Sequence, residues 1–148
     1  MKQKINVFVI LRFLVGVLFI VSGAEKLISP YQNFLYVVQS YEIVPSPLDK
    51  AIALVLPWIE FFSGIFLFLG FGLKAALRAL TFLIGAFILI AGQALLRNLP
   101  IAECGCFGEL ISLPLHVTFL LDVFLLSVVV MLFKNFDQTR QLSLDQRF

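Results

Sequence analysis

The sequence predicts an all-α protein: an integral membrane four-helix bundle with its N- and C-termini in the cytoplasm. Three observations support this. Of the 148 residues, 61 % are hydrophobic and 14 % are charged, whereas a soluble domain is roughly half apolar and about a quarter charged. Four apolar stretches reach the length of about 20 residues that a membrane helix needs. Basic residues gather on one side of these stretches, which sets their orientation.

The four stretches are each long enough for one crossing of the bilayer. Backbone groups in the bilayer core have no water to bond with, so each stretch is expected to be a helix. Together they form one domain over residues 1–134, followed by a polar cytoplasmic tail over residues 135–148 that we expect to be frayed. The predicted helices cover about residues 5–28, 51–71, 75–96 and 115–133.

The first stretch has a second interpretation, as a secretory signal peptide. Lys2 and Lys4 precede the apolar run, and Ser22, Gly23 and Ala24 offer small residues for cleavage. The run is longer than the apolar region of a signal peptide, and Arg12 interrupts it. These two features favour a first helix that stays in the protein.

The charges outside the membrane core are distributed unevenly. One side has lysine and arginine in both terminal segments and in the connection between the second and third helices. The opposite side has Lys26, Lys50 and Arg97, diluted by acidic residues. Because basic residues concentrate on the cytoplasmic side, the connection before the last helix faces outward. In a bacterium this is the periplasm or the cell exterior, where disulfides form and persist.

Three ionisable residues fall inside the predicted membrane core: Arg12, Glu60 and Asp122. Each costs about 2.5–3.5 kcal/mol at a helix centre if it is left alone. Measured from the cytoplasmic ends of the stretches, Arg12 lies four residues from the depth of the two acids, or about 6 Å. We therefore predict that Arg12 pairs with Glu60, Asp122 or both. Two roles stay open for this cluster: holding the helices together, and proton transfer or substrate binding.

Two further features concern packing. Arg12, Gly16, Gly23 and Lys26 share one face of the first helix, and small residues there let a neighbouring membrane helix approach closely. The segment of residues 31–41 holds all three tyrosines, which favour the headgroup level of a membrane. We expect it to form a short helix at the membrane interface.

The two cysteines of the chain, Cys104 and Cys106, are separated only by Gly105, and Gly108 follows closely. A disulfide needs particular Cα separations and a torsion near 90°. A one-residue spacer meets these requirements only with strain, and the glycines give the backbone freedom to do so. Strained disulfides are the easily reduced, catalytic kind. The spacing therefore favours a reversible redox pair, in which either sulfur can be the attacking one.

Other interpretations of the cysteines remain. They can form a permanent disulfide that fixes the loop, or stay inert thiols. With His116 they offer three metal ligands, but the usual zinc spacing of Cys-x2-4-Cys with a second pair is missing, so no metal site is predicted. His116 itself is either an ordinary interfacial residue or a group that transfers protons near the thiols.

The motifs together resemble the MauE family of methylamine utilisation proteins, within the wider DoxX-like group of small membrane proteins. The resemblance covers about residues 5–133. Its most specific part is Cys104-Gly105-Cys106-Phe107-Gly108, before the last helix. Individually weaker parts are Arg12 with Gly16, Ser22-Gly23 with Lys26, and Pro57 with Glu60 and Gly64.

The resemblance implies a bacterial inner-membrane protein of thiol–disulfide chemistry, working with a thioredoxin-like protein outside the cytoplasm. The layout also resembles quinone-linked disulfide-forming proteins such as DsbB and vitamin K epoxide reductase, which use two cysteine pairs. This chain has one pair, so an internal relay between two pairs is impossible. Either Cys104 and Cys106 exchange with both the partner and a quinone, in a site lined by phenylalanines and Trp58, or no quinone is used.

Three functions are compatible with these features. The leading hypothesis is a membrane thiol–disulfide oxidoreductase that uses Cys104 and Cys106. The second is a non-enzymatic accessory or assembly subunit with a structural disulfide. The third is a small-solute transporter that uses the intramembrane charges. A net charge of only +2 argues against a nucleic-acid partner.

Overall fold

The computed structural model describes residues 6–99 and 114–144, and within these ranges all regular structure is helical. Four of the helices are long and apolar enough to cross a membrane, which confirms the predicted all-α class and the four predicted membrane helices. The cytoplasmic location of the termini stays a prediction. Each end of the four long helices lies within one turn of the predicted end. The helices are α1 (Val7–Ile28), α2 (Tyr31–Ser40), α3 (Leu48–Leu69), α4 (Leu73–Leu96), α5 (Leu115–Lys134) and α6 (Phe136–Thr139).

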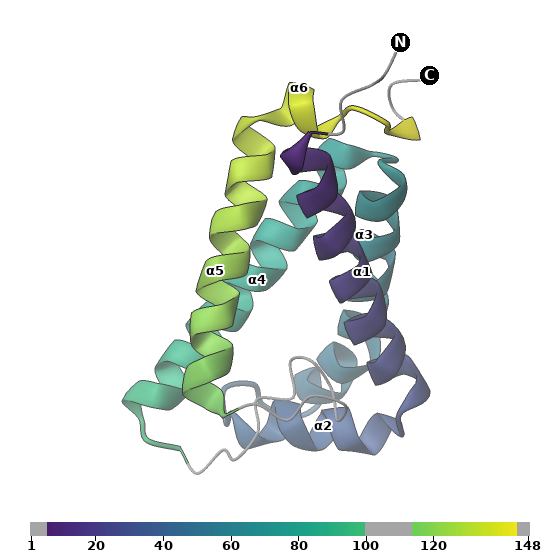
Figure 1. Ribbon diagram of the computed structural model, residues 1–148. Helices are drawn as coiled ribbons and strands as arrows, with labels where there is room; N and C mark the ends of the chain where they lie inside the picture. The colour runs from purple at the N-terminus through teal and green to yellow at the C-terminus, as the bar shows by residue number, and fades with distance from the viewer. Residues whose placement is uncertain (1–5, 100–113, 145–148) are drawn as a thin grey trace.

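The four long helices form two antiparallel pairs (Figure 1). α1 packs along α3, and α4 packs along α5. The two pairs approach each other at the end of the bundle that carries α6, which we call the α6 end. They diverge toward the opposite end, where α2 lies across the bundle, which we call the α2 end. Residues near the last turn of α1 and the first turns of α3 therefore have α2 beside them.

The α1–α3 pair is held close by glycines on both helices. Gly16 faces Phe68 and Gly23 faces Phe61, so the two helices run in opposite directions. A Cβ atom on Gly23 would lie 2.7 Å from the backbone nitrogen of Phe61, and one on Gly64 would lie 2.8 Å from that of Ile20. Only glycine permits this approach. The predicted small-residue face of the first helix thus faces a neighbouring helix, as expected.

The core at the contact between α4 and α5 is apolar, and so is much of the outer surface of the bundle. Leu77, Leu80, Ile84 and Leu132 are fully buried at the α4–α5 contact, together with Leu67 from α3. On the outside, Phe82 and Leu89 are 78 % and 75 % exposed. An apolar surface on this scale suits a lipid environment rather than water. The chain is therefore a multi-pass membrane protein.

Two local arrangements position the ends of the helices. At the α6 end, Gly70 and Gly72 adopt left-handed backbone angles, with φ of 70° and 56°, and make the tight turn between α3 and α4. At the α2 end, α2 is tied to the first turn of α3. Gln39 donates a hydrogen bond of 2.7 Å to Asp49, and the Tyr31 hydroxyl donates one of 3.1 Å to the Lys50 carbonyl. The helix expected at residues 31–41 is confirmed, since α2 spans Tyr31–Ser40.

The described part of the segment after α5, residues 135–144, is folded, contrary to our expectation of a frayed tail. Thr139 in α6 is fully buried, and its hydroxyl donates hydrogen bonds to the carbonyls of Leu132 and Asn135. Ser143 is also buried and packs against Gly70. The polar composition of this segment suggested disorder, but its backbone finds partners on α1, described below.

Candidate functional site

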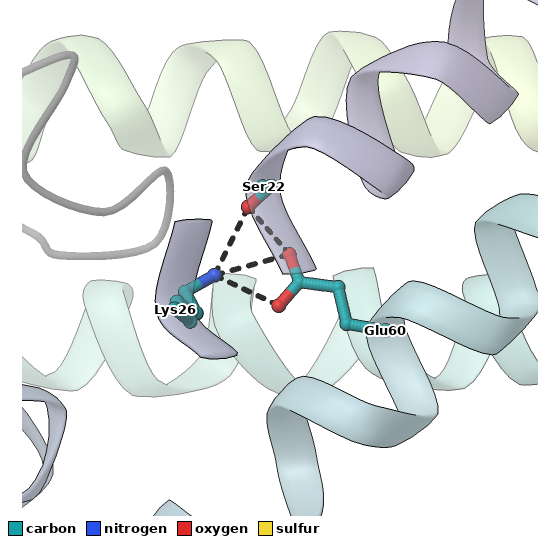
Figure 2. A network of polar contacts seen from close by, with 3 residues as sticks. All are labelled: Ser22, Lys26 and Glu60. Atoms are coloured by element: carbon teal, nitrogen blue, oxygen red, sulfur yellow. Dashed lines mark hydrogen bonds and ion pairs between the residues drawn. The ribbon is translucent and has the colours of Figure 1, made fainter. Parts of the chain in front are cut away.

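Three polar side chains form a buried network between α1 and α3 (Figure 2). The Lys26 ammonium donates to both carboxylate oxygens of Glu60, with Nζ to Oε2 and Oε1 distances of 2.8 and 3.0 Å. It also donates to the Ser22 hydroxyl at 3.0 Å. The Ser22 hydroxyl in turn donates to Oε1 of Glu60 at 2.7 Å. The side chains of Lys26 and Glu60 are each only 2 % exposed.

The local sequence explains why this network forms. Ser22 and Lys26 are four residues apart on α1, so they lie one turn apart on the same face. Gly23 stands between them and lets the α3 backbone at Phe61 come within contact distance. Glu60 precedes Phe61, so its carboxylate reaches the Ser22–Lys26 face directly. Gly23 therefore brings α3 close to α1, and Ser22 and Lys26 supply the hydrogen bonds that hold Glu60 in place.

The charges of the network balance each other. A buried carboxylate in the membrane is costly unless it is paired and hydrogen-bonded. Here one ammonium and one carboxylate neutralise each other at hydrogen-bond distance, and a hydroxyl supplies a further donor. The Lys26 ammonium also lies 5.6 Å from the ring centroid of Phe34 and 6.0 Å from that of Phe87. Both distances fall within the range of cation–π attraction.

The predicted pairing of Arg12 with Glu60 or Asp122 is wrong. The facing pairs Gly16–Phe68 and Gly23–Phe61 place Glu60 level with Ala24. Arg12 lies twelve residues further along α1, or about 18 Å away. The prediction assumed that α1 and α3 end at the same depth. In the fold, α1 continues about two turns beyond the end of α3, which carries Arg12 away from Glu60.

Arg12 instead clamps the segment after α5. Its side chain is fully buried, and its guanidinium donates to three backbone carbonyls. Nη1 donates to those of Thr139 at 2.7 Å and Gln141 at 3.1 Å, and Nη2 to that of Leu142 at 3.2 Å. A guanidinium offers five donors in a rigid fork, which suits several carbonyls at once. Arg12 is thereby a structural residue of the α6 end.

The other predicted residues that the structure describes lie on α5 and at the end of α4. Asp122 is buried on α5, 2 % exposed, one turn from buried Thr118. His116 is in the first turn of α5 and exposed. Arg97, assigned by the sequence to the outer side, makes an exposed ion pair of 3.5 Å with Glu42. Cys104, Gly105, Cys106 and Gly108 lie outside the described residues.

The described residues on either side of the cysteines are at the α2 end. Leu99 follows α4, and Leu115 begins α5. Both belong to an apolar cluster with Tyr41 at the end of α2 and Ala94 in α4. The chain therefore leaves and re-enters the described structure at the same end of the bundle as Lys26.

Sequence reasoning missed the role of Lys26. The prediction counted this lysine as an outer-side charge, although the same sequence placed it on the bundle-facing stripe of α1. The signal was present: Ser22-Gly23 followed by Lys26 combines a close-approach glycine with two polar residues on one helical face. An acidic residue that faces this part of the helix, such as Glu60, can pair with Lys26 and does not need Arg12 as its cation.

Comparisons with known proteins give a family but no near relative. The model of the family described as methylamine utilisation protein MauE matches residues 4–134. This range contains all four long helices, the Ser22–Lys26–Glu60 network and both cysteines. The search of curated proteins and the search of solved structures found no match.

Proposed function

Because the chain belongs to the family of methylamine utilisation protein MauE, we propose that it is a thiol–disulfide oxidoreductase of the bacterial cytoplasmic membrane. In this proposal Cys104 and Cys106 form a reversible disulfide that exchanges electrons with a thioredoxin-like protein outside the cytoplasm. The observation that carries the proposal is the Cys-Gly-Cys sequence itself, in a chain with no other cysteine. Its one-residue spacing favours a labile disulfide.

Charge placement on the folded chain supports an outward-facing pair. Lys74, Arg78, Lys134 and Arg140 lie at or near the α6 end. The segments at the α2 end carry fewer basic residues and several acids. By the positive-inside rule, the α6 end faces the cytoplasm. The connection between α4 and α5 then opens on the oxidising side, where a disulfide persists.

The exchange balances with the residues of the two proteins alone. A thiolate of the reduced partner attacks one sulfur of the Cys104–Cys106 disulfide and forms a mixed disulfide. The second thiolate of the partner then attacks the partner's sulfur in the mixed disulfide. This step releases the cysteine that was bound there and leaves a disulfide in the partner. The partner loses two electrons and two protons, and Cys104 and Cys106 gain them as two thiols. A labile disulfide here acts as the oxidant.

The structure changes the roles that the intramembrane charges take in this proposal. If Arg12 paired with both Glu60 and Asp122, one cation would face two carboxyl groups, and one of these could carry and transfer a proton. Instead, Glu60 has its own cation in Lys26, and Arg12 holds the α6 end. We assign Ser22, Lys26 and Glu60 to holding α1 against α3. Asp122 then becomes the remaining intramembrane candidate for proton transfer, with exposed His116 as a candidate nearer the surface.

A trapping experiment tests the proposal. Cys104→Ser and Cys106→Ser each leave one thiol that can form, but not resolve, a mixed disulfide. We expect at least one variant to accumulate a covalent adduct with an extracytoplasmic thioredoxin-like protein, visible on a non-reducing gel and lost on reduction. The double variant is the matched control and traps nothing.

Two results would contradict the proposal. One is the absence of any adduct in both single variants, with full cellular function kept by the double variant. That outcome would favour an accessory or assembly subunit with a dispensable disulfide. The other is an adduct that forms equally in the double variant, because it would not involve these sulfurs.

A further inference from the structure

One side of α4 carries two cations, an aromatic ring and a glycine, in that order from the α6 end. Lys74, Arg78 and Phe82 are spaced by four residues, so each lies one turn beyond the last on the same side of the helix. All three are exposed, Phe82 at 78 %. Gly85 follows on this side, and a Cβ atom there would meet nothing within 4 Å. We call these four residues the α4 stripe.

The α4 stripe borders the seam between α4 and α5, which pack along each other (Figure 1). The Lys74 ammonium lies 5.2 Å from the ring centroid of Phe136, the first residue of α6. Gly92 is about five turns from Lys74 and therefore on the same side of α4. A Cβ atom on Gly92 would lie 3.4 Å from the ring of Phe119 on α5. Contacts near both ends of α4 thus place this side of the helix next to α5.

Three exposed cations stand at the α6 end of this seam. Lys134, the last residue of α5, joins Lys74 and Arg78 and comes two residues before Phe136. Within residues 6–99 and 114–144, none of the three forms an ion pair, whereas Lys26 and Arg97 do. Asp137 is the one acidic residue in the segments 66–82 and 130–144. The charge of this surface therefore favours an anionic ligand.

The depth of Arg78 favours a ligand that belongs to the membrane. Basic residues that set topology lie in the connections and near the helix ends. Arg78 is in the second turn of α4, about 7–8 Å beyond its first residue, in a helix long and apolar enough to span a membrane. Phe82 and the open space at Gly85 continue the stripe toward the acyl chains. A free phosphate ion would contact the cations but gain nothing from this apolar continuation.

We propose that the α6 end of the α4–α5 seam binds an anionic phospholipid. Its phosphate oxygens accept hydrogen bonds from Lys74, Arg78 and Lys134, and an acyl chain runs past Phe82 and over Gly85. Basic side chains from neighbouring membrane helices are a known setting for anionic headgroups, and an arginine can offer two parallel donors to one phosphate. The inference uses neither cysteine, so it stands or falls independently of the proposed function.

Binding is tested by native mass spectrometry of the full chain released from nanodiscs. The bilayer is phosphatidylcholine that contains cardiolipin, an anionic phospholipid with two phosphates. The test variant combines Lys74→Gln with Arg78→Gln. The matched control combines Lys50→Gln with Arg97→Gln, which also removes one lysine and one arginine, but at the α2 end. Circular dichroism and size-exclusion chromatography check that both variants are folded.

We expect the wild-type chain to retain cardiolipin at least about tenfold more than phosphatidylcholine, after correction for their proportions in the bilayer. Each basic residue near the surface contributes a factor of about five in affinity for an anionic lipid. The test variant should therefore bind cardiolipin at least about tenfold more weakly, and the control should bind like the wild type. Excess inorganic phosphate should not displace the lipid. Because both leaflets contain cardiolipin, the result does not depend on which end faces the cytoplasm.

A second measurement locates the lipid without any substitution in the chain. A photoreactive cardiolipin with a diazirine in one acyl chain should label the peptides that contain Phe82 and Lys134 more than those of the α2 end. Uniform labelling, equal retention by the test variant and the wild type, or an equal loss in the control would each overturn the inference. Displacement by inorganic phosphate would overturn it too, because the site would then select a free anion.

Discussion

The pairing of Glu60 with Lys26, rather than with Arg12, can be measured as a coupling free energy. The perturbation is a double-mutant cycle with Lys26→Met, Glu60→Met and the combined variant. Methionine matches the length of glutamate, is one atom shorter than lysine, and suits an apolar site. Because the two groups bond at 2.8 Å and are each 2 % exposed, each single change leaves a buried charge without its partner.

The structure sets the expected magnitudes. Lys26→Met should cost about 3 kcal/mol of unfolding free energy, because an unpaired charge costs about 2.5–3.5 kcal/mol near a helix centre. Glu60→Met should cost less, about 2 kcal/mol, because the freed Lys26 is close to the end of α1 and can extend toward the interface. The double variant buries no charge, and replacing a buried ion pair by apolar side chains is often neutral or stabilising, so its cost should be at most about 1 kcal/mol. The coupling is then at least about 4 kcal/mol, because each single variant buries an unpaired charge and the double variant does not.

The assay is reversible unfolding in mixed micelles with a rising fraction of sodium dodecyl sulfate, followed by circular dichroism. The control cycle combines Arg12→Met with Glu60→Met. These residues are about 18 Å apart along the helix axis, so their effects should add within about 0.5 kcal/mol. Additive effects for Lys26 and Glu60, or a coupling above 1 kcal/mol for Arg12 and Glu60, would refute the assignment of partners.

Three further predictions concern the rest of the bundle. Arg12→Gln removes the donors to the carbonyls of residues 139–142, so hydrogen exchange in α6 should accelerate at least about tenfold, by mass spectrometry; unchanged exchange would exclude a clamp. Gly23→Ala should cost about 1–3 kcal/mol because it forces α1 from α3, whereas Gly85→Ala, with open space around its Cβ, should stay within about 0.5 kcal/mol; equal costs would contradict close packing at Gly23. A phosphatase fused after Arg140 should be inactive and a fluorescent protein there bright, since we place the α6 end in the cytoplasm; the reverse pattern would invert the topology.

The membrane helices were predictable because their signal is long and depends on the sequence alone. Twenty apolar residues specify one crossing whatever their neighbours are, and the observed ends of α1, α3, α4 and α5 confirm this. The glycine face of α1 was predictable for a similar reason, since Gly16 and Gly23 share one side of any helix. The helix of residues 31–40 could also be predicted from its own sequence alone.

The partners of the charges were not predictable in the same way. Pairing Arg12 with Glu60 required the relative shift of α1 and α3, which the glycine contacts with Phe61 and Phe68 determine. The order of the last segment was missed because its stability comes from outside it: Arg12, more than 120 residues earlier, supplies donors for its carbonyls. The composition of a segment indicates how much apolar surface the segment can bury by itself. It does not indicate whether another helix donates hydrogen bonds to the backbone of that segment.

The reduction potential of the Cys104–Cys106 pair tests the central claim most directly. The full chain in nanodiscs is equilibrated with glutathione and dithiothreitol buffers, and the remaining thiols are alkylated with a maleimide that shifts gel mobility. We predict a potential between about −120 and −230 mV, the range of catalytic disulfides. A potential below about −300 mV, typical of structural disulfides, or two thiols that never form a disulfide, would contradict a redox function.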